Sequence, residues 1–173
     1  MMRGFSKYLS ALAVAAFSFC APIAQADTPL PAPNGRVVLE VSGAINKHTN
    51  DAVAQFDLNQ LKALPVVEIT TSTPWTDGVV TFAGVSVAHL LQHVEAQGDT
   101  LHVTALNDYT ATMAARQLIE AGAILAYDMN GKRLSVRDKG PLWVIFPFDA
   151  NEAYQTDAYW SMAVWQVKSI SIE

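Results

Sequence analysis

Hydrophobic and polar positions alternate along much of the chain, as expected of β-strands with one buried face. Val37, Leu39 and Val41 show this alternation, and Leu101, Val103 and Ala105 repeat it. The run at 66–71 is rich in β-branched residues, so it predicts a buried strand. Further strands are expected over 79–82, 123–129, 132–136, 142–146 and 164–172.

Short helices are indicated where a capping residue precedes apolar positions at helical spacing. Asp57 precedes a helix predicted over 58–64, which ends before Pro65, and Ser86 precedes one over 87–96. A third short helix is expected over 114–121.

The pair Asn130-Gly131 is the strongest short hairpin signal in the chain, because both residues adopt positive φ readily. Together these elements predict an α+β fold that is mainly β, a mixed sheet or barrel-like domain with short helices. Without a further linker or repeat after Arg36, we expect one domain over 36–173.

The first 26 residues are typical of a cleavable signal peptide. Arg3 and Lys7 precede an apolar run at 9–21, and Ala24-Gln25-Ala26 supplies the small residues of a cleavage site. The run is shorter than the roughly 20 residues of a membrane-spanning helix. We therefore predict a periplasmic protein without stable membrane insertion, with an extended, proline-rich leader at 27–35 ahead of the domain.

Removal of the signal peptide changes both the cysteine content and the charge. Cys20, the single cysteine, is removed, which excludes disulfides and thiolate metal ligands from the mature chain. Without Arg3 and Lys7, nine of the 11 basic side chains remain against 16 acidic ones, so the net charge is about −7. A surface this acidic disfavours nucleic acid as a partner.

Candidate functional residues gather where three predicted strands begin or end, which is where scaffolds usually present functional loops. These residues can also have purely structural roles: Trp75 and Trp143 as core aromatics, and Asp108 as the residue that closes a turn. His89 and His93 are four residues apart on one helix, but Leu90 stands where a zinc-protease helix has its glutamate, so a solvated face is favoured. The candidates are Thr71, Ser72 and Trp75, then Asn107, Asp108 and Tyr109, and finally Arg137 and Trp143.

Four segments in order resemble the sulfite oxidase-like family, whose domain binds molybdopterin. The segment 82–91 resembles the family's region after its cysteine loop, and Asn107-Asp108-Tyr109 lies where the family has a tyrosine–serine–proline region. The segment 130–147, with Gly140-Pro141-Leu142, is similar to the family's glycine–proline–leucine–arginine motif, and 164–170 is similar to its closing strand. The resemblance implies the sulfite oxidase molybdopterin-binding fold across the mature chain.

The departures from the family pattern concern metal and anion binding. Where the family has its molybdenum-ligating cysteine, this chain has Thr71-Ser72-Thr73, and hydroxyls are poor replacements for a soft thiolate. Trp143 and Trp165 stand where the family has basic residues. The resemblance therefore implies a pterin ligand without molybdenum.

A pterin ring offers an amino group and a ring N–H side by side, which a carboxylate accepts, and a flat face for stacking. In such a pocket Asp108 is the candidate for the polar edge, with Asn107 assisting. Trp75, Tyr109 and Trp143 are candidates for stacking, and Thr71, Ser72 and Arg137 for the remaining edge.

Three functions stay open on the sequence. The first is a pterin-binding signalling protein, because small family members without the cysteine resemble periplasmic pterin-responsive regulators of membrane-bound cyclic-di-GMP enzymes, which control biofilm formation. Its partner would be the periplasmic domain of such an enzyme, with Tyr154, Tyr159 and Trp160 either at that interface or packed on the closing strand. The others are a molybdopterin-dependent oxidoreductase and a ligand-free interaction module.

Overall fold

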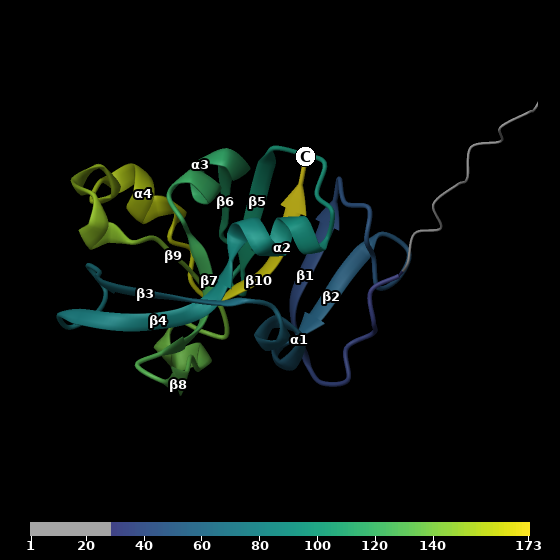
Figure 1. Cartoon of the computed structure of the whole chain (residues 1–173), viewed down its shortest axis with the longest axis horizontal. Coiled ribbons are helices and arrows are strands. Elements are labelled where there is room, and N and C mark those ends of the chain that lie inside the picture. Colours follow the sequence, from purple (N-terminus) through teal and green to yellow (C-terminus); the bar gives the residue numbers. More distant parts are fainter. Residues whose placement is uncertain (1–28) are drawn as a thin grey trace, which may run out of the picture.

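Two β-sheets of five strands each form the scaffold of the computed structural model, which describes residues 29–173 (Figure 1). The first sheet has the order β2-β1-β10-β5-β6, in which β1 and β10 are parallel and the other pairs antiparallel. Its strands are β1 (Val37–Gly43), β2 (Val53–Asp57), β5 (Thr100–Ala105), β6 (Thr110–Ala114) and β10 (Val167–Ile172).

The second sheet has the order β3-β4-β7-β8, and β9 pairs with the other part of β7. Its strands are β3 (Val66–Ser72), β4 (Val79–Ser86), β7 (Ile124–Met129), β8 (Lys132–Arg133) and β9 (Trp143–Ile145). In Figure 1, β3 and β4 extend as a long hairpin to one end of the molecule, the end at which α4 also lies.

Short helices complete the fold, which confirms the predicted class, a mainly β domain with few and short helices. The α-helices are α1 (Leu58–Ala63), α2 (Val87–His93), α3 (Ala115–Glu120) and α4 (Asp157–Met162). The 3-10 helices are η1 (Val136–Asp138), η2 (Phe148–Ala150) and η3 (Glu152–Tyr154).

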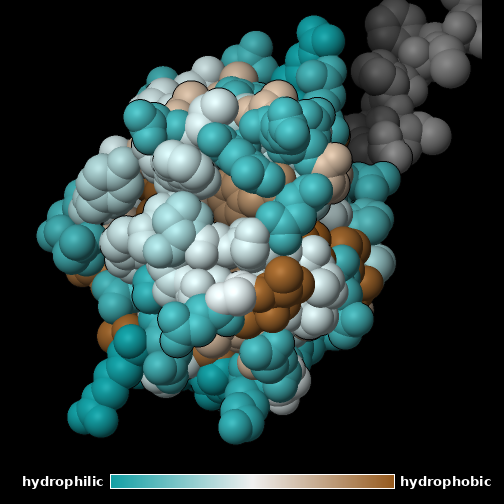
Figure 2. Space-filling model, turned by 90° about the vertical axis from the view of Figure 1, so that its left-hand side faces the viewer, coloured by the Kyte–Doolittle hydropathy of each residue, from teal (hydrophilic) through white to brown (hydrophobic). Residues whose placement is uncertain are grey.

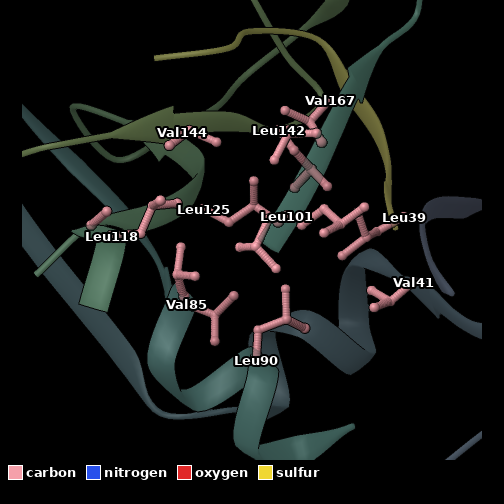
Figure 3. Close-up of a cluster of buried hydrophobic side chains, with 14 of the residues drawn as sticks. Leu39, Val41, Val85, Leu90, Leu101, Leu118, Leu125, Leu142, Val144 and Val167 are labelled. Atoms are coloured by element: carbon pink, nitrogen blue, oxygen red, sulfur yellow. The ribbon is translucent and has the colours of Figure 1, made fainter. Parts of the chain in front are cut away.

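The main core lies between the two sheets and α2 (Figure 3). Leu39 of β1 and Leu101 of β5 face Val85 of β4 and Leu125 of β7, and Leu90 of α2 closes the cluster. All five side chains are fully buried. The alternation predicted for 101–105 is confirmed as an inward face of the first sheet, as it is for Leu39 and Val41. Val37 instead is exposed, because the register of β1 against β2 shifts between Val37 and Leu39.

The predicted helix and hairpin signals are confirmed at the atomic level. Asp57 accepts a hydrogen bond from the Gln60 backbone N–H (2.9 Å), and the Gln60 side chain accepts one from the Asp57 N–H (2.9 Å), which makes a capping box. Ser86 caps α2 by accepting from the His89 N–H (3.1 Å). Asn130 and Gly131 join β7 to β8 with φ of 50° and 71°.

Several expectations about individual elements are wrong. The prediction that 66–71 is a buried strand fails, because β3 lies at the edge of its sheet and exposes Val66, Glu68 and Thr70. β2, β6 and α4 were not predicted: β2 and β6 are short edge strands with alternating polar residues, and α4 has no side-chain cap. The helix predicted over 87–96 ends earlier, at His93, and the strand predicted over 132–136 ends at Arg133.

The segment expected to be a leader packs on the domain where it is described. Leu30 belongs to the main core, and its N–H donates to the His48 carbonyl (2.7 Å). The N–H groups of Asn34 and Gly35 both donate to Asp57 Oδ2 (3.0 and 2.8 Å). The predicted signal peptide lies outside the described residues. Within residues 29–173, no helix has the length and apolar character needed to cross a membrane.

Asp57 therefore ties the N-terminal segment to α1, and its stabilising effect depends on pH. Backbone hydrogen bonds from Gln60 and Gly35 lower the pKa of this buried carboxyl. A lowered folded-state pKa means that the stabilisation is complete above the unfolded pKa and is lost as the pH falls through the folded pKa. Asp57→Asn should therefore lower Tm at neutral pH and flatten the decline of Tm as the pH falls below about 5. Asp77→Asn, in the exposed β3–β4 loop, is the control; equal Tm–pH curves for both variants would refute this role.

Candidate functional site

An apolar cavity of about 400 Å³ lies between the β3–β4 loop, the end of β5 and α4. Three indoles and a phenol dominate its walls. Figure 2 looks onto this end of the molecule, where side chains of intermediate hydropathy gather in the middle of the face and hydrophilic ones towards its edges. The lining residues are Trp75, Ala105, Asn107, Tyr109, Trp160, Ser161, Ala163, Val164 and Trp165.

Trp75 is held in place from both sides. The backbone N–H of Trp75 donates to Thr73 Oγ1 (3.2 Å), and Lys139 Nζ donates to the backbone carbonyl of Trp75 (3.5 Å). Its ring centroid lies 6.0 Å from that of Trp143 and 5.6 Å from that of Trp165, with the latter ring edge-on. Aromatic pairs at this spacing add to the stabilisation from burial. The half-buried indole of Trp75 is therefore a fixed wall of the cavity.

Trp143 supports that wall from the core. Its side chain is 1% exposed, and its Nε1–H donates to the Ala163 carbonyl (3.1 Å). The ring packs edge-on against Phe82, with centroids 5.4 Å apart, and Lys139 Nζ lies 5.5 Å from the ring centroid. The reading of Trp143 as a core aromatic agrees with this burial. It also borders a second cavity of about 380 Å³, which Trp75, Arg137 and Lys139 line as well.

Asn107, Asp108 and Tyr109 form the turn between β5 and β6. The Tyr109 N–H donates to Asn107 Oδ1 (3.2 Å), and the Tyr109 side chain stays half-exposed at the cavity. Asp108 has a φ of 65°, and its carboxylate forms an ion pair with Lys168. The hydrogen bond and charge of Lys168 lower the pKa of Asp108. The sequence-level alternative, that Asp108 closes a turn, matches this position.

Thr71 and Ser72 fasten the end of β3 to η2. The backbone N–H and the hydroxyl of Ser72 both donate to the Asp149 carboxylate (2.6 Å each). These bonds lower the pKa of Asp149. The Asp149 N–H in turn donates to Oγ1 of Thr71, which is fully buried (3.0 Å). Both hydroxyls are thus engaged within the protein.

The eight predicted site residues are therefore divided. Trp75, Asn107 and Tyr109 meet in the first cavity, and Trp75, Arg137 and Trp143 border the second, which shares the Trp75 wall. Thr71, Ser72 and Asp108 line neither. Sequence reasoning did not assign Trp160, Ser161 and Trp165 to the site, although the aromatic content of 159–165 was a usable signal.

Tyr154 and Tyr159, the proposed interface aromatics, pack largely on the protein itself. Their ring centroids lie 4.9 Å apart, and Tyr159 meets Phe146 edge-on at 5.2 Å. Both are half-buried against the main core. Trp160, the third member of that group, packs against the same core and also lines the cavity.

The two-sheet fold is that of a sulfite oxidase-like molybdopterin-binding domain. The chain belongs to this family: residues 28–150 match the family described as "Oxidoreductase molybdopterin binding domain". A similar solved structure is the sulfane dehydrogenase SoxCD from Paracoccus pantotrophus, with a TM-score of 0.56 and 16% sequence identity. The match covers 78% of this chain but 37% of that one, and at this identity it concerns the fold. No curated protein matches the chain.

The residues present fit the two parts of a molybdopterin unequally. A flat pterin ring fits a cavity walled by indoles and a phenol. The metal does not fit the donors at the end of β3, because the Thr71 hydroxyl is buried and already bonded, and hydroxyls are hard ligands. Residues 29–173 contain no group of three metal-binding side chains.

The expectation that His93 lies on a solvated face is wrong, because His93 is half-buried against Phe56. Burial and the charge of Lys47 lower the pKa of His93.

Proposed function

We propose that this protein binds a pterin without molybdenum and acts as a periplasmic signalling protein rather than as an enzyme. The observation that carries the proposal is the cavity walled by Trp75, Tyr109, Trp160 and Trp165 in a family whose domain binds molybdopterin. Concave, mostly apolar sites with few polar groups are typical of small-ligand binding.

The ring is proposed to stack on Trp75, whose orientation is fixed by Trp143 and Trp165. The Asn107 amide stands at the same cavity and can both donate to and accept from a pterin edge. Asp108 stays a candidate for that edge, but Lys168 holds its carboxylate in an ion pair.

These two residues give a graded prediction. Asn107→Ala should weaken pterin binding more than Asp108→Asn does, because Asn107 lines the cavity and Asp108 does not. Titration by calorimetry measures both affinities. A larger loss for Asp108→Asn would instead restore the carboxylate as the main contact to the ring edge.

The signalling part of the proposal rests on the family likeness of small members that lack the cysteine. Such a protein would report pterin binding to the periplasmic domain of a membrane-bound cyclic-di-GMP enzyme. Its location follows from the predicted signal peptide.

Metal analysis and thermal shifts separate this proposal from its two alternatives. The protein is purified from its own periplasm, analysed for molybdenum, and heated with and without reduced and oxidised pterins. We expect no stoichiometric molybdenum and a higher Tm with at least one pterin. Stoichiometric molybdenum would support an oxidoreductase instead, and unchanged Tm with every pterin would support a ligand-free interaction module.

A further inference from the structure

We propose that a second cleft, separate from the aromatic cavity, binds an acidic, partly apolar peptide segment of a protein partner. The cleft has a volume of about 600 Å³ and lies between the first sheet and the segment 133–136, which runs from the end of β8. β1 and β10 supply one wall, and Arg133 to Val136 with Pro141 supply the other. It shares no lining residue with the aromatic cavity.

Two unpaired guanidinium groups mark this cleft. Arg36 and Arg133 both line it, both are exposed, and within residues 29–173 neither takes part in an ion pair. Lys47, Lys62 and Arg116 each have an acidic partner elsewhere on the surface, whereas Arg137, which does not line this cleft, is also without an ion pair within residues 29–173. An arginine fork binds a carboxylate through two parallel hydrogen bonds, so two free forks favour a ligand with carboxylates.

The other charged groups of the cleft are already engaged. Lys168 forms an ion pair with Asp108, and the Glu40 carboxylate accepts from Gln55 Nε2 (2.8 Å). Asp138, next to the second wall, accepts from the Ser135 hydroxyl (2.6 Å). Among the residues that line the cleft, three side chains are positive, Arg36, Arg133 and Lys168, and one is negative, Glu40, so the lining is positively charged on a protein whose net charge is negative.

Apolar side chains stand between these charges. Val37, Leu106 and Val136 line the cleft and are 36%, 42% and 50% exposed. A simple inorganic anion would leave these apolar surfaces uncovered, whereas a peptide with both acidic and apolar residues would cover them.

Two other kinds of partner fit less well. The net charge of −5 opposes long polyanions such as nucleic acid and opposes anionic membranes. A concave cleft also matches an extended segment better than a flat lipid surface. That the partner is a signalling protein rests on the proposed function. That the ligand of the cleft is acidic and partly apolar follows from the lining residues alone.

The test uses a fluorescein-labelled peptide of alternating glutamate and leucine, followed by fluorescence anisotropy with the full protein. The matched probes are a lysine–leucine peptide and a glutamate–serine peptide of equal length. We expect the glutamate–leucine peptide to bind at least tenfold more tightly than either, with an affinity that falls as salt increases.

The double variant Arg36→Glu/Arg133→Glu should lower this affinity at least tenfold. Lys47→Glu/Arg116→Glu changes the net charge equally but away from the cleft, and should bind as the unmodified protein does. Thermal unfolding checks that both double variants are folded, and if the first is not, Arg36→Gln and Arg133→Gln replace it.

Equal binding by the two double variants would overturn the proposal, as would binding of anionic phospholipid vesicles without binding of the acidic peptide. Pterin affinity, measured in parallel, distinguishes the two proposals. If the unmodified protein binds a pterin but not the glutamate–leucine peptide, only the cleft proposal is refuted; if it binds the peptide but no pterin, only the pterin site is refuted.

Discussion

Replacing Trp75 by alanine is expected to weaken pterin binding by about 10- to 100-fold, because stacking of a flat heterocycle on an aromatic side chain contributes about 1–3 kcal/mol. Trp75 is the wall that Trp143 and Trp165 hold at a fixed angle, so its ring is oriented before the ligand arrives. Such preorganisation lowers the entropic cost of binding. Calorimetry of both proteins with the same pterin measures the change.

The control for this variant is Trp75→Phe, which keeps a stacking face and should retain most of the affinity. Tyr154→Phe, outside the cavity lining, should have no effect. Undiminished affinity in Trp75→Ala would show that the ligand does not stack there.

Replacing Trp143 by alanine is expected to lower the free energy of unfolding by about 3–5 kcal/mol, as other large-to-small core substitutions of aromatic residues do. The side chain is almost completely buried, packs edge-on against Phe82 and donates to the Ala163 carbonyl. Urea unfolding measures the loss as a lower midpoint.

Trp165→Ala is the matched control for stability, because this indole is 38% exposed and contacts Trp75 only at its edge. Its loss of stability should be clearly smaller, about 1 kcal/mol. Similar stability in Trp143→Ala and Trp165→Ala would contradict the role of Trp143 as the buried support of the Trp75 wall.

Much of the fold follows from local signals in the sequence. Leu39, Val41, Leu101 and Val103 alternate because each strand has one buried face, and that alternation is visible without the structure. Asp57 is visible as a cap because its side chain satisfies backbone N–H groups that are left free at a helix start.

The strands that the sequence did not predict, and the burial of β3 that it predicted wrongly, depend on position in a sheet rather than on local signals. β2 and β6 lie at the edges of the first sheet, where one side of each strand has no neighbour and polar residues are tolerated. β3 is apolar and β-branched in sequence, yet half of it is exposed, because burial of a strand depends on its place in the sheet. Local propensity does not determine that place.

The candidate site could be predicted in part, because the ends of strands are visible in the sequence but the contacts made by the tertiary fold are not. Trp75, Asn107 and Tyr109 lie at the ends of separate strands, and the sheets bring these ends to one cavity. Asp108 turns towards Lys168, 60 residues away in sequence, so its ion pair depends on the tertiary fold. Trp160 and Trp165 reach the cavity from α4 and the segment after it, which carry no cap or alternation to place them.

Pterin binding without metal is tested most directly by calorimetry of the protein with a panel of reduced and oxidised pterins, in the presence of a metal chelator. We expect one-to-one binding of at least one pterin with micromolar or tighter affinity, unaffected by the chelator and weakened by Trp75→Ala. No binding across the panel, or binding that requires added molybdate, would contradict it.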